Sequence, residues 1–182
     1  MHSVSRRLAF NLNFIKSNSF STRCVICNKS ESNQFVEIKD ISSKNGGLIR
    51  RITMINDKQR NTLSLEAIKH LQDSINSIDF DKYRVVILSA GKRHVFSSGH
   101  NLKELTDTKV AEEVFKQMSN LCASFRNIPL PTISEVYGLA AAGGCQLAAS
   151  CDLTIASNKA TFSTPGVKFG IFCTTPGKMA FT

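Results

Sequence analysis

Two glycine-rich segments place small residues where a strand is expected to end and a helix to begin. The first is Phe96-Ser-Ser-Gly99-His100-Asn101-Leu102-Lys103, and the second runs from Gly138 to Gln146. Small side chains let a ligand approach the backbone closely, and the first N–H groups of a helix have no partner within it. Two such turns facing each other could hold one carbonyl oxygen between two N–H donors, as in an oxyanion hole. Close packing of a helix on a strand would need the same residues, so the spacing alone leaves both interpretations open.

The residues that precede the first segment predict strands and a helix in alternation. Residues 35–41 alternate apolar and polar side chains, an Asn-Gly-Gly turn follows, and residues 48–55 complete a hairpin. Residues 64–78 place apolar side chains on one helical face, with Ser64 as the N-cap. Residues 85–88 form a continuous apolar run, which is typical of a parallel strand buried on both faces.

A second cycle of helix and strand surrounds the other glycine-rich segment. Residues 109–126 predict a helix and residues 132–136 predict a strand. Residues 139–150 predict a Gly/Ala-rich helix, and strand patterns return at 152–156 and 161–162. The fold class is therefore α/β, built from βαβ units.

The charge distribution separates the first 30 residues from the rest of the chain. The formal charge is +9, yet five of the 23 basic residues and none of the 14 acidic ones lie in residues 1–30. This acid-free, Ser-rich composition is typical of a mitochondrial transit peptide, with a disordered basic terminus as the alternative. The remaining body is only mildly basic, which argues against nucleic-acid binding. No apolar run approaches the length of a transmembrane segment, and the Cys24–Cys27 pair lacks the second ligand pair of a metal site.

Three blocks of the sequence carry motifs of a known family. FSSGHNLKEL, PTISEVYGLAAAGGCQLAASCDLTIAS and ATFSTPGVKFGIFCTTPG resemble consecutive segments of the enoyl-CoA hydratase/isomerase (crotonase) superfamily. Within it, the combination resembles the mitochondrial enoyl-CoA hydratase domain-containing protein 3 subgroup. The resemblance implies a crotonase-like spiral of ββα units. It implies an acyl-CoA-binding core at residues 35–178, preceded by the targeting segment 1–30 and followed by a divergent tail at 179–182.

The resemblance also implies roles for residues of the two glycine-rich segments. The thioester carbonyl of an acyl-CoA would lie between the backbone N–H groups of His100 and Gly143, and Gly143 would open a helix. The implied substrate-binding residues are Ser98, Gly99, His100, Asn101, Leu102, Lys103 and Gly143. No metal and no cofactor is implied beyond the CoA carried by the substrate.

The departures from the family pattern bear on catalysis. Hydratases use two glutamates to position water and move its proton, and here those positions hold Gln146 and Gly166. Neither residue can exchange a proton at neutral pH. Asn101 also replaces the usual Asp. His100 is then the best substitute, because its imidazole titrates near neutrality, with a structural or gating role as the alternative. Glu104 is expected to be a solvated helix residue.

These observations predict a mitochondrial matrix protein of fatty-acid metabolism that binds acyl-CoA and has weak or no hydratase activity. One alternative is an active acyl-CoA hydratase or lyase with an unconventional acid/base such as His100. Another is a non-catalytic subunit of a family hetero-oligomer. Full-length members are implied to form homotrimers or hexamers. Because the chain stops at Thr182, we expect the family's C-terminal helical region to be missing, and the oligomeric state of this chain does not follow from the resemblance.

Overall fold

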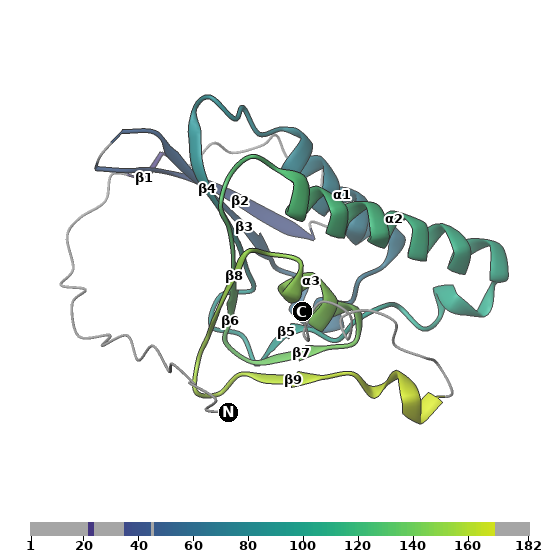
Figure 1. Ribbon diagram of the computed structural model, residues 1–182. Helices are drawn as coiled ribbons and strands as arrows, with labels where there is room; N and C mark the ends of the chain where they lie inside the picture. The colour runs from purple at the N-terminus through teal and green to yellow at the C-terminus, as the bar shows by residue number, and fades with distance from the viewer. Residues whose placement is uncertain (1–21, 24–34, 45, 170–182) are drawn as a thin grey trace, which may run out of the picture.

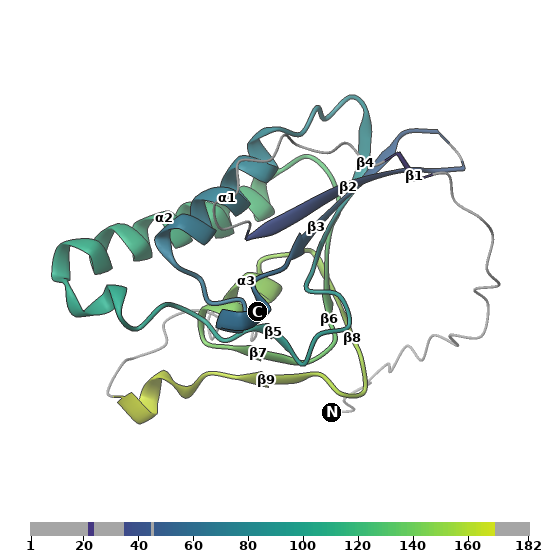
Figure 2. The ribbon, with the colours of Figure 1, turned by 180° about the vertical axis from the view of Figure 1, so that it is seen from behind.

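The computed structural model describes residues 22–23, 35–44 and 46–169. These residues form two β-sheets and three α-helices (Figures 1 and 2). The predictions for most of the targeting segment, for the Cys24–Cys27 pair and for residues 170–182 lie outside the described residues.

The larger sheet has six strands in the order β1-β2-β3-β4-β6-β8. The strands β1, β2 and β3 pair antiparallel, whereas the pairs from β3 onward are parallel. The predicted hairpin and the alternation of strand and helix are therefore confirmed. The strands are β1 (Thr22–Arg23), β2 (Val36–Ser42), β3 (Leu48–Met54), β4 (Tyr83–Ser89), β6 (Thr132–Val136) and β8 (Leu153–Ala156).

The smaller sheet is parallel and runs across the larger one at its lower end in Figure 1. Its strands are β5 (Val95–Ser97), β7 (Leu139–Ala141) and β9 (Thr161–Ser163), in the order β5-β7-β9. Helix was the prediction for residues 139–150, and it is wrong for 139–141. Alanine favours helix, but here the pairing of β7 with two neighbouring strands outweighs that local preference.

Two long helices cover one face of the larger sheet. They are α1 (Leu65–Asn76) and α2 (Thr108–Asn127), and they pack against each other (Figures 1 and 2). Ser64 caps α1 as predicted, since its hydroxyl accepts a hydrogen bond from the Ala67 N–H at 3.2 Å. The short helix α3 (Gly143–Ala149) lies in the corner between the sheets. Short 3₁₀ turns complete the chain: η1 (Asp57–Gln59), η2 (Glu104–Thr106) and η3 (Pro165–Phe169).

The core lies between the larger sheet and the helices. Ile52, Val86 and Leu88 of the sheet and Ile68 of α1 are fully buried there. The expectation that β4 is buried on both faces is wrong, because Val85 and Ile87 are only partly covered. Among the described residues all three α-helices lie on the side of Val86 and Leu88. None of the described helices has the length and hydrophobicity needed to cross a membrane.

Candidate functional site

The fold brings the two glycine-rich segments into direct contact at Gly99. This residue is buried and has a φ of +90°. A Cβ added to it would lie 2.9 Å from the Ala142 Cβ and 3.0 Å from the Ala141 carbonyl oxygen. Only a residue without a side chain therefore allows the turn after β5 to touch the turn between β7 and α3. The two glycine-rich turns therefore lie directly against each other.

The contact leaves two backbone N–H groups without a backbone acceptor. Leu63 accepts from the Asn101 N–H at 3.4 Å and donates to the Gly99 carbonyl at 2.8 Å, so the His100 N–H points away from Leu63. Gly143 is the first residue of α3, and its N–H has no acceptor within the helix. In the described part of the chain, no backbone hydrogen bond outside helices and strands uses either group.

Ala142 joins β7 to α3 in a conformation that is unusual for a residue with a side chain. Its φ is 48° and its ψ is −118°. Non-glycine residues held in such regions cost about 1–3 kcal/mol. Two hydrogen bonds hold it there: the Ala142 N–H donates to the Ser163 carbonyl at 2.8 Å, and the Gln146 N–H donates to the Ala142 carbonyl at 3.1 Å. The strained turn starts α3 directly after β7, next to Gly99.

The His100 side chain lies in the space between α2 and α3. Its Nε2 is 3.0 Å from the point that a Cβ on Gly143 would occupy, and its ring meets Phe115 edge-on with 5.2 Å between ring centroids. Nδ1 is buried and has no hydrogen-bond partner among the described residues. Burial lowers the pKa of His100 below its ordinary 6.5, and the Leu63 backbone and the Glu104 carboxylate oppose this only in part. The imidazole is therefore neutral at physiological pH.

Phe115 belongs to α2 but is not part of its buried face. The structure leaves it 47% exposed, with its ring on His100. The fully buried residues of α2 nearby are Val114 and Met118. Phe115 lies one position beyond Val114, at the edge of the apolar stripe, and this position was the only signal in the sequence for its different role.

Gln146 and Gly166, which were predicted to occupy the hydratase glutamate positions, carry no acid. Gln146 lies one helical turn after Gly143 and on the same face of α3. Burial raises the pKa of the Cys122 thiol in α2, and the side chain of Ser150, the charge of Arg126 and the side chain of Gln146 oppose the rise only in part. Gly166 is a buried residue of η3 and is not among the described glycines with positive φ.

Glu104 is not a solvated residue, and the expectation for it is wrong. One carboxylate oxygen accepts from the Leu65 N–H at 2.8 Å, and the other accepts from the Asn101 side-chain amide at 3.1 Å. The side-chain oxygen of Asn101 in turn accepts from the Lys103 N–H at 3.2 Å. The sequence did not indicate this arrangement, because Leu65 and Glu104 are 39 residues apart in the chain.

The other predicted substrate-binding residues divide into two groups. Ser98 is held by the chain itself, since its N–H donates to the Arg60 carbonyl at 3.1 Å and its hydroxyl lies 3.2 Å from that of Thr62. Leu102 and Lys103 are exposed, and Leu102 has 59% of its surface open to solvent. These two remain available to a ligand, whereas Ser98 supports the turn.

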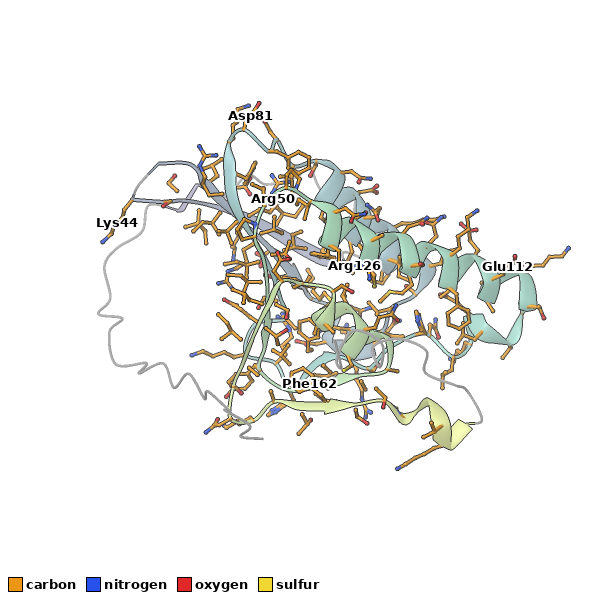
Figure 3. All side chains as sticks on the ribbon, viewed as in Figure 1. Lys44, Arg50, Asp81, Glu112, Arg126 and Phe162 are labelled. Carbon is orange, nitrogen blue, oxygen red and sulfur yellow. The ribbon has the colours of Figure 1, made fainter. Side chains whose placement is uncertain are left out.

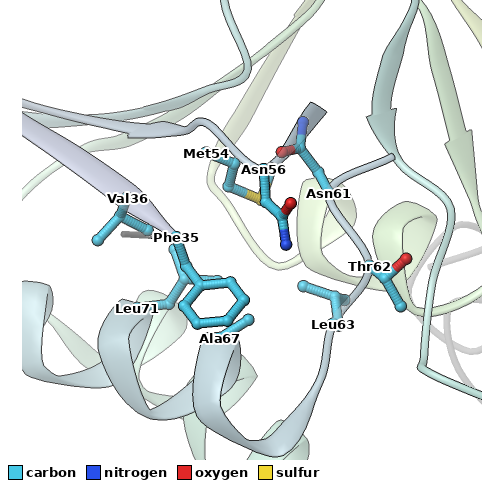
Figure 4. Close-up of a pocket in the computed structure, with 9 residues that line it drawn as sticks. All are labelled: Phe35, Val36, Met54, Asn56, Asn61, Thr62, Leu63, Ala67 and Leu71. Atoms are coloured by element: carbon cyan, nitrogen blue, oxygen red, sulfur yellow. The ribbon is translucent and has the colours of Figure 1, made fainter. Parts of the chain in front are cut away.

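A small pocket lies between the start of β2, the end of β3 and the first turns of α1 (Figure 4). Its walls are mostly apolar. Asn61 is 3% exposed there, and its side-chain oxygen has no partner among the described residues. The lining residues are Phe35, Val36, Met54, Asn56, Asn61, Thr62, Leu63, Ala67 and Leu71.

Comparison with family models identifies the family of this chain. The family model described as enoyl-CoA hydratase/isomerase matches residues 44–181. This chain belongs to the enoyl-CoA hydratase/isomerase family.

Individual relatives show which subgroup of the family this chain resembles. The chain is 47% identical over 154 residues to the mitochondrial enoyl-CoA hydratase domain-containing protein 3 of Xenopus laevis, covering 82% of this chain and 51% of that protein. It is 50% identical over 133 residues to the Homo sapiens protein of the same name, covering 71% of this chain and 44% of the relative. The chain thus spans about half the length of the relatives it matches, and the predicted likeness to this subgroup is confirmed.

Solved structures confirm the crotonase-like fold. The crystal structure of human enoyl Coenzyme A hydratase domain-containing protein 3 superposes with a TM-score of 0.72 at 45% identity, over 81% of this chain and 57% of that one. An enoyl-CoA hydratase/isomerase family protein from Silicibacter pomeroyi gives a TM-score of 0.68 at 32% identity, over 79% and 62% of the two chains.

Proposed function

We propose that this protein binds an acyl-CoA thioester, with the thioester oxygen between the N–H groups of His100 and Gly143. The contact of Gly99 with Ala142 and Gly143 is the observation that carries the proposal, because it places the two turns together. Both N–H groups lack a backbone acceptor in the described structure. Fixed donors aimed at a developing oxyanion stabilise it without reorganisation.

Hydration of an enoyl-CoA by this protein is weak or absent. Gln146 and Gly166 leave no carboxylate to activate water or move its proton. Positioned proton transfer contributes about 10²–10⁴-fold per group. The polarising N–H groups remain, so a small residual rate of crotonyl-CoA hydration is compatible with the proposal.

The binding part is tested with a thioester enolate analogue and two variants of Gly143. Gly143→Pro removes the N–H donor and adds side-chain atoms, whereas Gly143→Ala adds only a Cβ, which meets the movable edge of His100 at 3.0 Å. We expect Pro to weaken analogue binding by roughly 100-fold more than Ala. Equal affinities in two folded variants, measured by calorimetry, would show that the Gly143 N–H does not contact the ligand.

The catalytic part is tested by restoring the acids. Gln146→Glu combined with Gly166→Glu should raise crotonyl-CoA hydration by more than either change alone, since the two carboxylates act on one water. Gly166 lies in a 3₁₀ turn, so a side chain there meets no left-handed backbone. A wild-type rate similar to that of ordinary hydratases would overturn the proposal of weak activity.

A specific observation favours a second candidate, a hydratase or lyase in which His100 carries the proton. Its imidazole is neutral, lies against Gly143, and has a nitrogen without a partner in the described structure. In that case a measurable wild-type rate would disappear in His100→Gln. It would also depend on an ionisation below the ordinary 6.5.

The site of action that we propose is the mitochondrial matrix, in fatty-acid metabolism. The similar proteins of Xenopus laevis and Homo sapiens carry "mitochondrial" in their names. Residues 1–30 combine five basic residues with no acidic one. A reporter fused to these residues should enter mitochondria, and a diffuse cytosolic signal would remove this part of the proposal.

A further inference from the structure

Glu104 connects three elements that meet at the candidate site. It opens η2, directly after the Gly99–Lys103 turn. Its carboxylate accepts one hydrogen bond from Leu65, the first residue of α1, and one from the Asn101 side chain. Hydrogen bonds to a charged group contribute about twice as much as neutral ones. The carboxylate is therefore a strong link between α1 and the turn that carries His100.

The backbone on the other side of this turn is held less firmly. The Leu63 carbonyl accepts from the Asn101 N–H at 3.4 Å, a long hydrogen bond. The Leu63 N–H donates to the Gly99 carbonyl at 2.8 Å. His100 lies between these two attachment points, so the direction of its N–H depends on where Asn101 is held.

We propose that Glu104 is a positioning residue, which ties Asn101 to the start of α1 and so fixes the His100 N–H relative to Gly143. This inference rests on the proposed thioester site. It gives a function to a carboxylate that neither moves a proton nor touches the ligand. It also accounts for Asn101, whose side chain has both an acceptor use, toward Lys103, and a donor use, toward Glu104.

The pKa of His100 reports whether the Glu104 carboxylate lies beside the imidazole, and the His100 amide shift reports the direction of its N–H. The negative carboxylate raises the pKa of His100, against the larger lowering by burial. The other described groups beside the imidazole are the Leu63 backbone before α1, the Phe115 ring from α2 and the Gly143 backbone from α3, and none of them titrates. Removal of the carboxylate should therefore lower the pKa of His100 further.

The experiment compares Glu104→Ala and Glu104→Gln in the full chain. Gln keeps one oxygen, which can accept from the Leu65 N–H or from the Asn101 amide but not from both, and it loses the charge, whereas Ala loses both links. We expect the pKa of His100, followed by NMR of its ring, to fall in both variants. We expect affinity for the thioester enolate analogue to fall roughly tenfold in Ala and roughly threefold in Gln. The control is Glu112→Gln on the exposed face of α2, at the far end of the molecule in Figure 3, which should change neither.

Failure of this inference is distinguishable from failure of the proposed function. If the wild type binds no analogue, the thioester proposal fails, and the His100 pKa together with the Leu65 and His100 amide shifts still decides the role of Glu104. An unchanged His100 amide shift in a folded Glu104→Ala variant overturns the inference. So does wild-type affinity in a folded Glu104→Ala variant. A variant with a lower melting temperature but unchanged His100 signals would assign Glu104 to stability alone.

Discussion

Two regions of this molecule bury polar groups in opposite ways. At one end of the larger sheet, Arg50 is 7% exposed and has a partner for each of its nitrogens. It binds Asp40 with two hydrogen bonds of 3.0 Å, donates to Ser77 at 2.8 Å, and lies over the Tyr83 ring at 4.5 Å. At the candidate site, a buried His100 nitrogen and two backbone N–H groups lack partners in the described structure.

The effects on ionisation differ in the same way. Burial alone would raise the pKa of Asp40, but hydrogen bonds from Arg50 and Tyr83 outweigh it and the pKa is lowered. For His100 the effect of burial exceeds the opposing interactions, so its pKa is lowered and the neutral imidazole is favoured. A charge that is fully paired stabilises the fold, whereas polar groups left unpaired cost stability and remain available to a ligand. The comparison thus separates the part of the chain that holds the fold from the part that can bind.

The largest expected effect comes from breaking the paired region. Arg50→Ala leaves the Asp40 carboxylate buried without its partner, and we expect the free energy of unfolding to fall by about 3 kcal/mol. Arg51→Ala is the matched control. Arg51 and its partner Glu135 are 29% and 34% exposed, so the loss should be about 0.5 kcal/mol. Urea unfolding measures the loss of stability in both variants. Equal losses would show that the buried ion pair of Arg50 contributes no more to stability than the more exposed pair of Arg51.

A smaller loss is expected at the contact between the two turns. Gly99→Ala adds a Cβ against Ala142 at a positive φ, and we expect a loss of about 2 kcal/mol together with weaker binding of a thioester analogue. Gly46→Ala has a similar φ of +83° and nothing within 4 Å of the added Cβ. It should lose about 1 kcal/mol without affecting binding. If both variants lose the same stability and keep binding, the contact at Gly99 is not what positions the site.

A gain of about 1 kcal/mol is expected from relieving strain beside the site. Ala142→Gly removes the side chain from a backbone conformation that disfavours it, and the gain is reduced by the greater entropy of glycine in the unfolded chain. Ala148→Gly, at a buried position inside α3, should instead lose about 1 kcal/mol or more. Thermal unfolding compares the two, and a loss at Ala142 would show that no strain is stored there.

The smallest effect is expected from pH. Because the folded chain lowers the pKa of His100 below 6.5, the unfolded chain binds this proton more tightly. The contribution of neutral His100 is therefore complete above pH 6.5 and decreases as the pH falls below that value. His100→Gln should flatten the loss of stability on acidification, whereas His94→Gln, at an exposed position, should not. An unaltered profile in His100→Gln would place that imidazole in solvent.

The sequence by itself determined the alternation of strands and helices and the two glycine-rich turns. Periodicity and capping residues are local signals, and they located α1, α2 and the β2–β3 hairpin. The motifs also indicated the family, and they led to the prediction that Gln146 and Gly166 replace its two glutamates. These properties follow from residues close together in the chain, so no long-range contact was needed to infer them.

Only the tertiary structure decided how the site is assembled. The strand β7 forms because β5 and β9 pair with it, although its own sequence favours helix. Glu104 meets Leu65 across 39 residues, and Gly99 meets Ala142 just after the ends of the neighbouring strands β5 and β7. The position of the His100 ring against Gly143 and Phe115 depends on three elements at once. Such contacts are set by packing between distant segments, and local pattern carries no information about which distant residue will be the partner.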